Sequence, residues 1–186
     1  MARVLIPIAP GSEELEAVTI IDLLRRTEIE VVVAGLQSGP VTCSRQTVII
    51  PDADLDAVLA QDFDMIVLPG GLPGAQHLWE HQALLQRLQQ QAENGGEVAA
   101  ICAAPRVLAE ADLLAGRRAT SFPGFLDNLD DKAPAEYLEA PVVEDGNIIT
   151  SRGPGTAMDF ALTLIERLTD RATRDEVEGR LQRPNQ

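Results

Sequence analysis

The chain has 186 residues, of which 24% are charged, and its formal net charge at pH 7 is −14. An acidic chain without a basic tract lacks the Lys and Arg that neutralise phosphates, so nucleic-acid binding is not expected. No apolar run approaches the length of a membrane span, and no cleavage-site pattern follows the first apolar run, so neither a membrane anchor nor a signal peptide is expected.

Size and cysteine content predict one domain across residues 1–186, large enough for a core without disulfides or metals. Aromatic residues make up only 3%, so the core must come from Val, Leu, Ile and Ala, which suits parallel strands covered by helices. Cys43 and Cys102 are widely separated and form no Cys-x-x-Cys motif. They are compatible with a reducing compartment, and a cytoplasmic location is expected.

Strand-like and helix-like segments alternate along the chain, which predicts an α/β fold with a mostly parallel sheet. The expected strands are 3–8, 30–34, 64–68, 98–101 and 118–121, with hairpins at 40–50 and 142–150. The expected helices are 12–26, 84–92, 106–114, 156–168 and 171–181. Residues 122–139 are rich in Pro, Gly and Asp and are expected to form an irregular lid or connector.

Cys102 ends a buried strand, and Pro105 suits the first turn of a helix that follows it. A thiol at such a turn faces free backbone N–H groups and the positive end of the helix dipole, which favours the thiolate. The arrangement follows the logic of a nucleophile elbow, with alanines where glycines are usual. The alternative is an inert core thiol, because free cysteines are among the most buried residues.

Three loops follow predicted strands, and in parallel sheets ligands bind beyond the carboxyl ends of the strands. These loops carry Glu16, the pair Gly70 and Gly71, and Cys102. If the strands are neighbours, a thiol, a carboxyl and a glycine-lined oxyanion site converge, which supports covalent chemistry on a carbonyl. Glu16 shares the apolar helix face of Ile20, so we expect it to be partly buried and protonated. The alternative is that Glu16 is an ordinary solvated residue of the helix.

His77 and His81 are four residues apart and would share a face if residues 73–79 formed a helix. Without a Glu-containing metalloprotease pattern they are interpreted as a solvated surface pair, and no metal site is expected.

Four motifs occur in order along the chain: Gly11-Ser12-Glu13-Glu14-Leu15-Glu16-Ala17-Val18, Leu68-Pro69-Gly70-Gly71, Ala99-Ala100-Ile101-Cys102-Ala103-Ala104-Pro105 and Thr150-Ser151-Arg152-Gly153-Pro154-Gly155-Thr156. On these motifs the chain resembles the ThiJ/PfpI superfamily, and most closely the DJ-one-like proteins of its bacterial YajL branch. The resemblance covers nearly the whole chain. It implies a flavodoxin-like sandwich with helices on both faces, a homodimer, and chemistry that needs no cofactor.

The resemblance also implies roles for individual residues. Cys102 would be the nucleophile and the oxidation-sensitive group, in a strained backbone conformation. Glu16 would be a protonated acid that hydrogen-bonds the sulfur, and the backbone amides of Gly71 and Ala103 would form the oxyanion site. Gly70 and Phe122 would line the pocket.

Arg26 and Arg45 match residues that help to make an anion-friendly pocket near the dimer interface, with the segment around Arg45 approaching the partner's site. Cys43 matches an interface cysteine. Phe122 departs from the DJ-one pattern, because relatives carry a histidine there, whereas the YajL branch shares the Phe-Pro. Since Phe122 cannot transfer protons, Glu16 must carry the acid–base work.

Three functions are compatible with these residues. The first is an enzyme of stress defence acting on glyoxal, methylglyoxal or their early adducts on amines and thiols, including glycated protein. The second is a redox-sensing stress protein or chaperone in which oxidation of Cys102 to a sulfinate is the signal. The third is a cysteine peptidase or amidotransferase-like hydrolase, which usually requires a histidine beside the cysteine.

Overall fold

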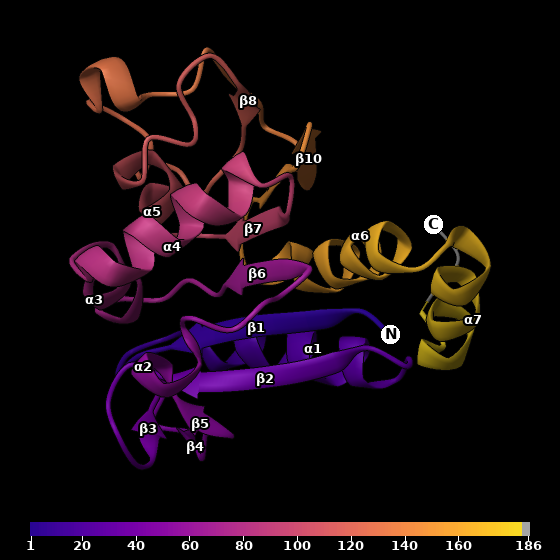
Figure 1. Ribbon diagram of the computed structural model, residues 1–186. Coiled ribbons are helices and arrows are strands. Elements are labelled where there is room, and N and C mark those ends of the chain that lie inside the picture. The colour runs from indigo at the N-terminus through magenta and orange to yellow at the C-terminus, as the bar shows by residue number, and fades with distance from the viewer. Residues whose placement is uncertain (184–186) are drawn as a thin grey trace.

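The computed structural model describes residues 1–183 (Figure 1). The strands are β1 (Arg3–Ile8), β2 (Glu30–Gly35), β3 (Val41–Thr42), β4 (Val48–Ile49), β5 (Ala53–Asp54), β6 (Met65–Leu68), β7 (Glu97–Ile101), β8 (Arg118–Ala119), β9 (Glu136–Tyr137), β10 (Val142–Asp145) and β11 (Ile148–Ser151). The α-helices are α1 (Glu14–Arg25), α2 (Leu55–Val58), α3 (Gly74–Trp79), α4 (Gln82–Glu93), α5 (Pro105–Glu110), α6 (Ala157–Leu168) and α7 (Arg171–Leu181). Two 3-10 turns are η1 (Asp130–Lys132) and η2 (Pro154–Thr156).

Seven strands form the central sheet in the order β10-β11-β7-β6-β1-β2-β5. All neighbours are parallel except β10 and β11, which form an antiparallel hairpin. The mostly parallel α/β sheet expected from the alternating segments is therefore confirmed. β7, β6 and β1 lie side by side, so the loops that follow them meet at one edge.

Two apolar clusters pack on opposite faces of this sheet (Figure 1). Side chains of α1, α6 and α7 belong to one cluster, and side chains of α2, α4 and α5 belong to the other, while α3 contributes Ala75 to the first and Leu78 to the second. β1 contributes to both because successive strand residues point to opposite faces: Val4 and Ile6 join the first cluster and Leu5 the second. The result is the flavodoxin-like sandwich implied by the resemblance.

The bounds of α1 and α5 differ from the sequence expectation for reasons that the structure shows. α1 begins at Glu14 rather than at Ser12, because the buried Ser12 hydroxyl accepts a hydrogen bond from the Ala9 N–H at 3.0 Å. α5 ends at Glu110 rather than at residue 114, and Asp112 adopts a φ of 56°, which a continuing helix does not allow.

The 122–139 segment is less irregular than expected. Its strand β9 pairs in parallel with β8, and the Lys132 ammonium of η1 lies 2.9 Å from the Glu110 carboxylate of α5. The segment is thus attached to the helix that follows the Cys102 elbow.

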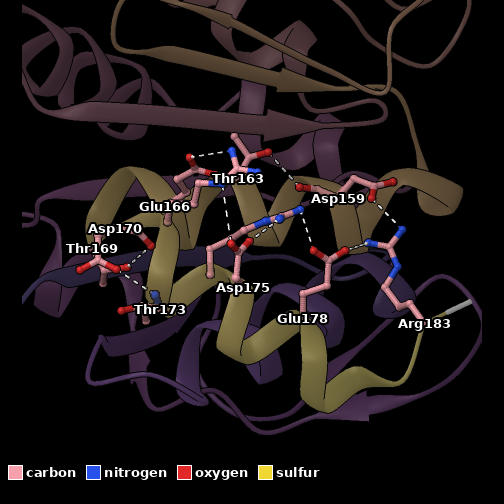
Figure 2. A network of polar contacts seen from close by, with 11 residues as sticks. Asp159, Thr163, Glu166, Thr169, Asp170, Thr173, Asp175, Glu178 and Arg183 are labelled. Atoms are coloured by element: carbon pink, nitrogen blue, oxygen red, sulfur yellow. Dashed lines mark hydrogen bonds and ion pairs between the residues drawn. The ribbon is translucent and has the colours of Figure 1, made fainter. Parts of the chain in front are cut away.

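A polar network joins the last two helices (Figure 2). The Arg183 guanidinium lies 2.8 Å from Asp159 of α6 and 3.3 Å from Glu178 of α7. α7 begins at the residue expected from the sequence, where the Asp170 side chain accepts a hydrogen bond from the Thr173 N–H. Among residues 1–183, no helix combines the length and apolar composition needed to cross a bilayer.

Candidate active site

Cys102 occupies a strained turn between β7 and α5. Its φ is 64°, in the left-handed region that costs a non-glycine residue about 1 to 2 kcal/mol. Two backbone hydrogen bonds hold this conformation: the Cys102 N–H donates to the Ser151 carbonyl at 3.0 Å, and the Cys102 carbonyl accepts from the Phe122 N–H at 2.8 Å. Pro105 occupies the first turn of α5 as expected. The thiol is therefore placed rigidly at a strand-to-helix elbow.

Gly70 packs against both Cys102 and Glu16, whose side chains hydrogen-bond each other, and it leaves no room for a side chain of its own. A Cβ at Gly70 would lie 2.7 Å from Cys102 Cβ and 2.9 Å from Glu16 Oε2. The Gly70 N–H donates to Glu16 Oε2 at 2.8 Å. At the next residue, Gly71, the φ is 87°, and a Cβ there would lie 2.3 Å from the backbone nitrogen of Glu13. Both glycines are thus required for the three loops to approach one another.

Glu16 is fully buried on the face of α1 that also buries Ile20, as its helical spacing indicates. Burial raises the pKa of Glu16 to about 7, although the hydrogen bond from Gly70 opposes this shift. Its second oxygen, Oε1, has no hydrogen-bond partner among the described residues. A buried carboxyl with a free oxygen beside a thiol is suited to holding and moving a proton near neutral pH.

The pKa of Cys102 differs from the sequence expectation. Burial and the neighbouring Glu16 carboxylate raise it to about 12, and the backbone amides of Gly71 and Ala103 lower it only in part. The backbone amides at the turn thus favour the thiolate as expected, but burial and Glu16 outweigh them in the pKa of Cys102. Because a protonated Glu16 exerts no such repulsion, a thiolate at Cys102 is most stable when the carboxyl carries the proton.

The Gly71 and Ala103 amides both hydrogen-bond Cys102. These are the two groups expected to form the oxyanion site, and the structure brings them together around the nucleophile. Two N–H donors fixed in this way can stabilise negative charge on sulfur or on a carbonyl oxygen attached to it.

The hairpin loop that carries Arg45 is fastened to the start of α1. The Arg45 and Thr47 N–H groups donate to the Glu14 carboxylate at 2.9 and 3.2 Å. Although burial opposes it, hydrogen bonds from backbone N–H groups and the Ser44 hydroxyl lower the pKa of Glu14 to about 2. The Arg45 side chain is exposed. Its predicted approach to a partner's site stays a prediction.

Arg26 lies far from the thiol within its own subunit. It follows the last residue of α1, roughly 15 Å along the helix from Glu16, and its guanidinium is 2.8 Å from Asp22. Cys43 is buried in the subunit, and burial together with nearby carboxylates raises its pKa to about 11. Their predicted places at a dimer interface stay predictions.

His77 and His81 are half-buried and hydrogen-bonded rather than a solvated surface pair, and they do not share a helix face. α3 ends at Trp79, and His81 instead caps α4, where its Nδ1 accepts from the Leu84 N–H at 3.1 Å. His77 Nδ1 lies 3.1 Å from the Pro10 carbonyl. In residues 1–183 no group of three or more His, Cys, Asp or Glu side chains could hold a metal ion.

Tyr137 is a site-supporting residue that the sequence reasoning missed. Its hydroxyl donates a hydrogen bond to the Ser121 carbonyl at 3.0 Å. The next residue, Phe122, donates its N–H to the Cys102 carbonyl. Arg152 donates to the same hydroxyl at 3.3 Å. Tyr137 lies in the 122–139 connector, where the neighbouring residues show no periodic pattern. No local sequence signal therefore predicts its contact with the Cys102 elbow.

Comparison with known proteins agrees with this geometry. The model of the DJ-1/PfpI family matches residues 2–167. The chain belongs to the DJ-1/PfpI family. Its more specific resemblance to the YajL branch stays a prediction.

Several relatives align with nearly the whole chain. Protein dj-1beta of Drosophila melanogaster is 45% identical over 175 residues, covering 93% of this chain and 92% of that protein. The glutathione-independent glyoxalase DJR-1.2 of Caenorhabditis elegans is 37% identical over 167 residues, covering 90% and 88%. By contrast, the chain spans only 38% of the length of Protein DJ-1 homolog B of Arabidopsis thaliana, to which it is 44% identical over 91% of its own length.

The fold also matches a solved structure of the family. The crystal structure of Drosophila melanogaster DJ-1beta superposes with a TM-score of 0.93 at 42% identity, covering 99% of both chains. This similarity confirms the expected fold class for the chain.

Proposed function

We propose that the chain is a cofactor-independent enzyme that converts glyoxal, methylglyoxal or their early adducts into hydroxy acids. The observation that carries this proposal is the pairing of Cys102, at a φ of 64°, with a fully buried Glu16 whose pKa is about 7. A family relative named as a glutathione-independent glyoxalase supports the same class of reaction.

The first step forms a covalent adduct. Ionised Glu16 accepts the Cys102 thiol proton, and the sulfur attacks the aldehyde carbon of the α-oxoaldehyde. A carbon–sulfur bond forms while the carbonyl π bond opens to an oxyanion, which the Gly71 and Ala103 amides stabilise. Glu16 returns the proton to this oxygen, which gives a hemithioacetal and a carboxylate again.

The second step moves hydrogen within the adduct. Glu16 removes the proton from the former aldehyde carbon and delivers it to the neighbouring carbon, while the hydroxyl proton of the hemithioacetal passes to the oxygen on that neighbouring carbon, which leaves a thioester and a hydroxyl group. Water then cleaves the thioester, so that the hydroxy acid leaves and the Cys102 thiol is restored. The net reaction adds one water to the α-oxoaldehyde, and the internal transfer of hydrogen balances the oxidation of one carbon against the reduction of the other.

The test is the formation of lactate from methylglyoxal by the purified protein. We expect Cys102→Ser to abolish turnover and Glu16→Gln to lower kcat/KM by about 100-fold or more, since each removes a group that acts on the reacting atoms. Unchanged turnover by purified Cys102→Ser contradicts the proposal. Release of free amine from a glycated peptide, measured on the same variants, tests the deglycase form of the activity.

A redox-sensing or chaperone role is the second proposal, because the same geometry suits an oxidised sulfur. A sulfinate on Cys102 adds oxygens beside the Gly71 and Ala103 amides, and protonated Glu16 can donate to one of them. Mass spectrometry after mild peroxide tests this role: oxidation of Cys43 with Cys102 left reduced contradicts it. Suppression of client aggregation that persists in Cys102→Ser indicates chaperoning independent of the thiol.

The hydrolase alternative has less support. Peptidases and amidotransferases of this kind pair the cysteine with a histidine. Here His77 contacts the Pro10 carbonyl and His81 caps α4. The resemblance implies a histidine in DJ-one relatives at the position of Phe122, which cannot transfer protons.

Homodimerisation is also proposed, and exposed apolar side chains support it. Leu15 and Val18 on α1 and Val48 and Ile50 at β4 are each about half exposed or more. We call these four residues the apolar face. Val18 and Ile50 line one shallow groove, so the two elements form a continuous surface there.

A further inference from the structure

Phe122, whose backbone contacts the Cys102 carbonyl, presents a partly exposed aromatic ring. The side chain is 46% exposed, although large aromatic residues are usually buried. Its ring packs edge-on against Phe125, with ring centroids 6.2 Å apart and an interplanar angle of 74°. On another side, a Cβ built at Gly153 would lie 3.4 Å from Phe122 Cδ2, so the ring rests on a glycine backbone. These contacts fix the ring while leaving part of it open.

The backbone of Phe122 ties this ring to the reaction centre. Its N–H donates to the Cys102 carbonyl at 2.8 Å, and the Tyr137 hydroxyl holds the preceding carbonyl at 3.0 Å. Gly153 follows Ser151 by two residues, and the Ser151 carbonyl accepts the Cys102 N–H. Both the ring and the surface on which it rests are therefore anchored to the elbow.

The opposite loop adds a second apolar side chain. Leu72 follows Gly71, whose amide hydrogen-bonds Cys102, and Leu72 is 51% exposed. The nearby cation of Arg152 is engaged, because its guanidinium contacts the Tyr137 hydroxyl and lies 3.7 Å from the Glu139 carboxylate. Two of the loops whose backbones contact Cys102 thus carry exposed apolar or aromatic side chains, Leu72 and Phe122.

We propose that Phe122 determines substrate specificity at the Cys102 site and favours α-oxoaldehydes that carry an aryl group over those that carry a methyl group. This inference rests on the proposed function. An aryl substituent on the carbon next to the thiol adduct can meet the open part of the ring in an offset or edge-to-face arrangement, which a methyl group cannot do. The preference is for the substituent, while Cys102 and Glu16 perform the same steps on either substrate.

The experiment compares kcat/KM for phenylglyoxal and methylglyoxal in the wild-type protein and two variants. Phe122→Leu keeps an apolar side chain but removes the ring, and we expect the phenylglyoxal to methylglyoxal ratio to fall about fivefold. Phe122→Tyr keeps the ring and serves as the matched control, with a ratio within about twofold of wild type. Thermal unfolding of each variant verifies that the fold is retained.

A binding measurement separates failure of this inference from failure of the proposed function. Mandelate and lactate are the corresponding hydroxy acids, and calorimetric titration of each needs no turnover. We expect mandelate to bind more tightly than lactate in the wild type and this preference to shrink in Phe122→Leu.

The kinetic and binding results together distinguish failure of the glyoxalase function from failure of the aryl specificity. If neither aldehyde is turned over while the mandelate preference depends on the Phe122 ring, the glyoxalase function fails and the aryl specificity stands. An equal kcat/KM ratio in wild type and Phe122→Leu overturns the specificity, as does a mandelate preference that is absent or unaffected by Phe122→Leu.

Discussion

Glu16 has no exposed surface, and burial raises its folded-state pKa from 4.5 to about 7. Between these values the folded protein binds a proton that the unfolded chain releases. Stability from this group is therefore complete below pH 4.5 and is lost as the pH rises through 7. The shift corresponds to about 3 kcal/mol. The same burial that prepares Glu16 for proton transfer thus destabilises the fold at alkaline pH.

We expect Glu16→Gln to remove this pH dependence. Between pH 4.5 and 8, the unfolding free energy of the wild type should fall relative to that of Glu16→Gln by up to about 3 kcal/mol. Urea unfolding across this range measures the difference. Glu28→Gln is the control, because Glu28 is exposed. A difference that does not decrease with pH would show that Glu16 is not held as a neutral acid.

Gly70 offers a second test at the level of single residues. In Gly70→Ala the new Cβ would overlap Cys102 Cβ and Glu16 Oε2, and neither neighbour can retreat into solvent. We expect a loss of about 1 to 3 kcal/mol in unfolding free energy, as for other overpacked sites, together with loss of turnover. Urea unfolding and lactate formation provide the two measurements.

Gly179 supplies the contrasting substitution. It lies within α7, and an added Cβ there would meet no atom within 4 Å. Gly179→Ala should leave turnover unchanged and raise stability slightly, because alanine favours the helix. Equal behaviour of the Gly70 and Gly179 variants would contradict the steric role of Gly70.

At the level of elements, local pattern predicted the regular segments well. The bounds of β1 and α7 are those expected, because an apolar run and a helical period mark them independently of their neighbours. The start of α1 was misplaced because Ser12 forms its hydrogen bond with the preceding loop. The β8–β9 pair could not be predicted, since each strand has two residues and gains stability only from its distant partner.

α7 depends on charge more than on apolar contact. Val177 is its one buried residue, whereas Arg174 lies 2.7 Å from Asp175 and 2.8 Å from Glu178. Figure 2 shows Asp159 and Glu178 on either side of the Arg183 guanidinium. Each ion pair at the surface contributes about 0 to 1 kcal/mol to stability. In 1 M salt the Debye length is about 3 Å, so the attraction between such charges is weakened.

We therefore expect α7 to open locally in high salt. Amide hydrogen exchange within α7 should become a few times faster when NaCl is raised from 50 mM to 1 M, and Arg183→Gln should show fast exchange already at low salt. The amides of α6, whose side chains fill the core, serve as the internal control and should not change. Exchange in α7 that does not respond to salt would indicate that the apolar contacts of Val177 and Leu181 hold the helix.

At the scale of the whole molecule, strand order assembles the candidate site. Cys102, Glu16 and Gly71 follow β7, β1 and β6, which are adjacent in the sheet, so their convergence could be predicted from three loops and the rule for parallel sheets. The pKa direction of Cys102 could not be predicted, because it depends on how closely the Glu16 carboxylate approaches and how little water remains. Both are properties of packing between loops far apart in sequence.

The apolar face provides the last test, that of the proposed homodimer. A stable interface buries about 800 Å² per partner around an apolar centre, and α1 with β4 presents the exposed Val18 and Ile50 along one groove. Light scattering should give twice the 20.0 kDa chain mass for the wild type and the single-chain mass for Val18→Asp. Gln86→Asp, on α4 and across the sheet, is the matched control and should remain dimeric. Val18→Asp should dissociate the dimer because an unpaired carboxylate at the centre of an apolar interface costs several kcal/mol. A dimeric Val18→Asp would place the interface elsewhere, and a monomeric wild type would refute dimerisation.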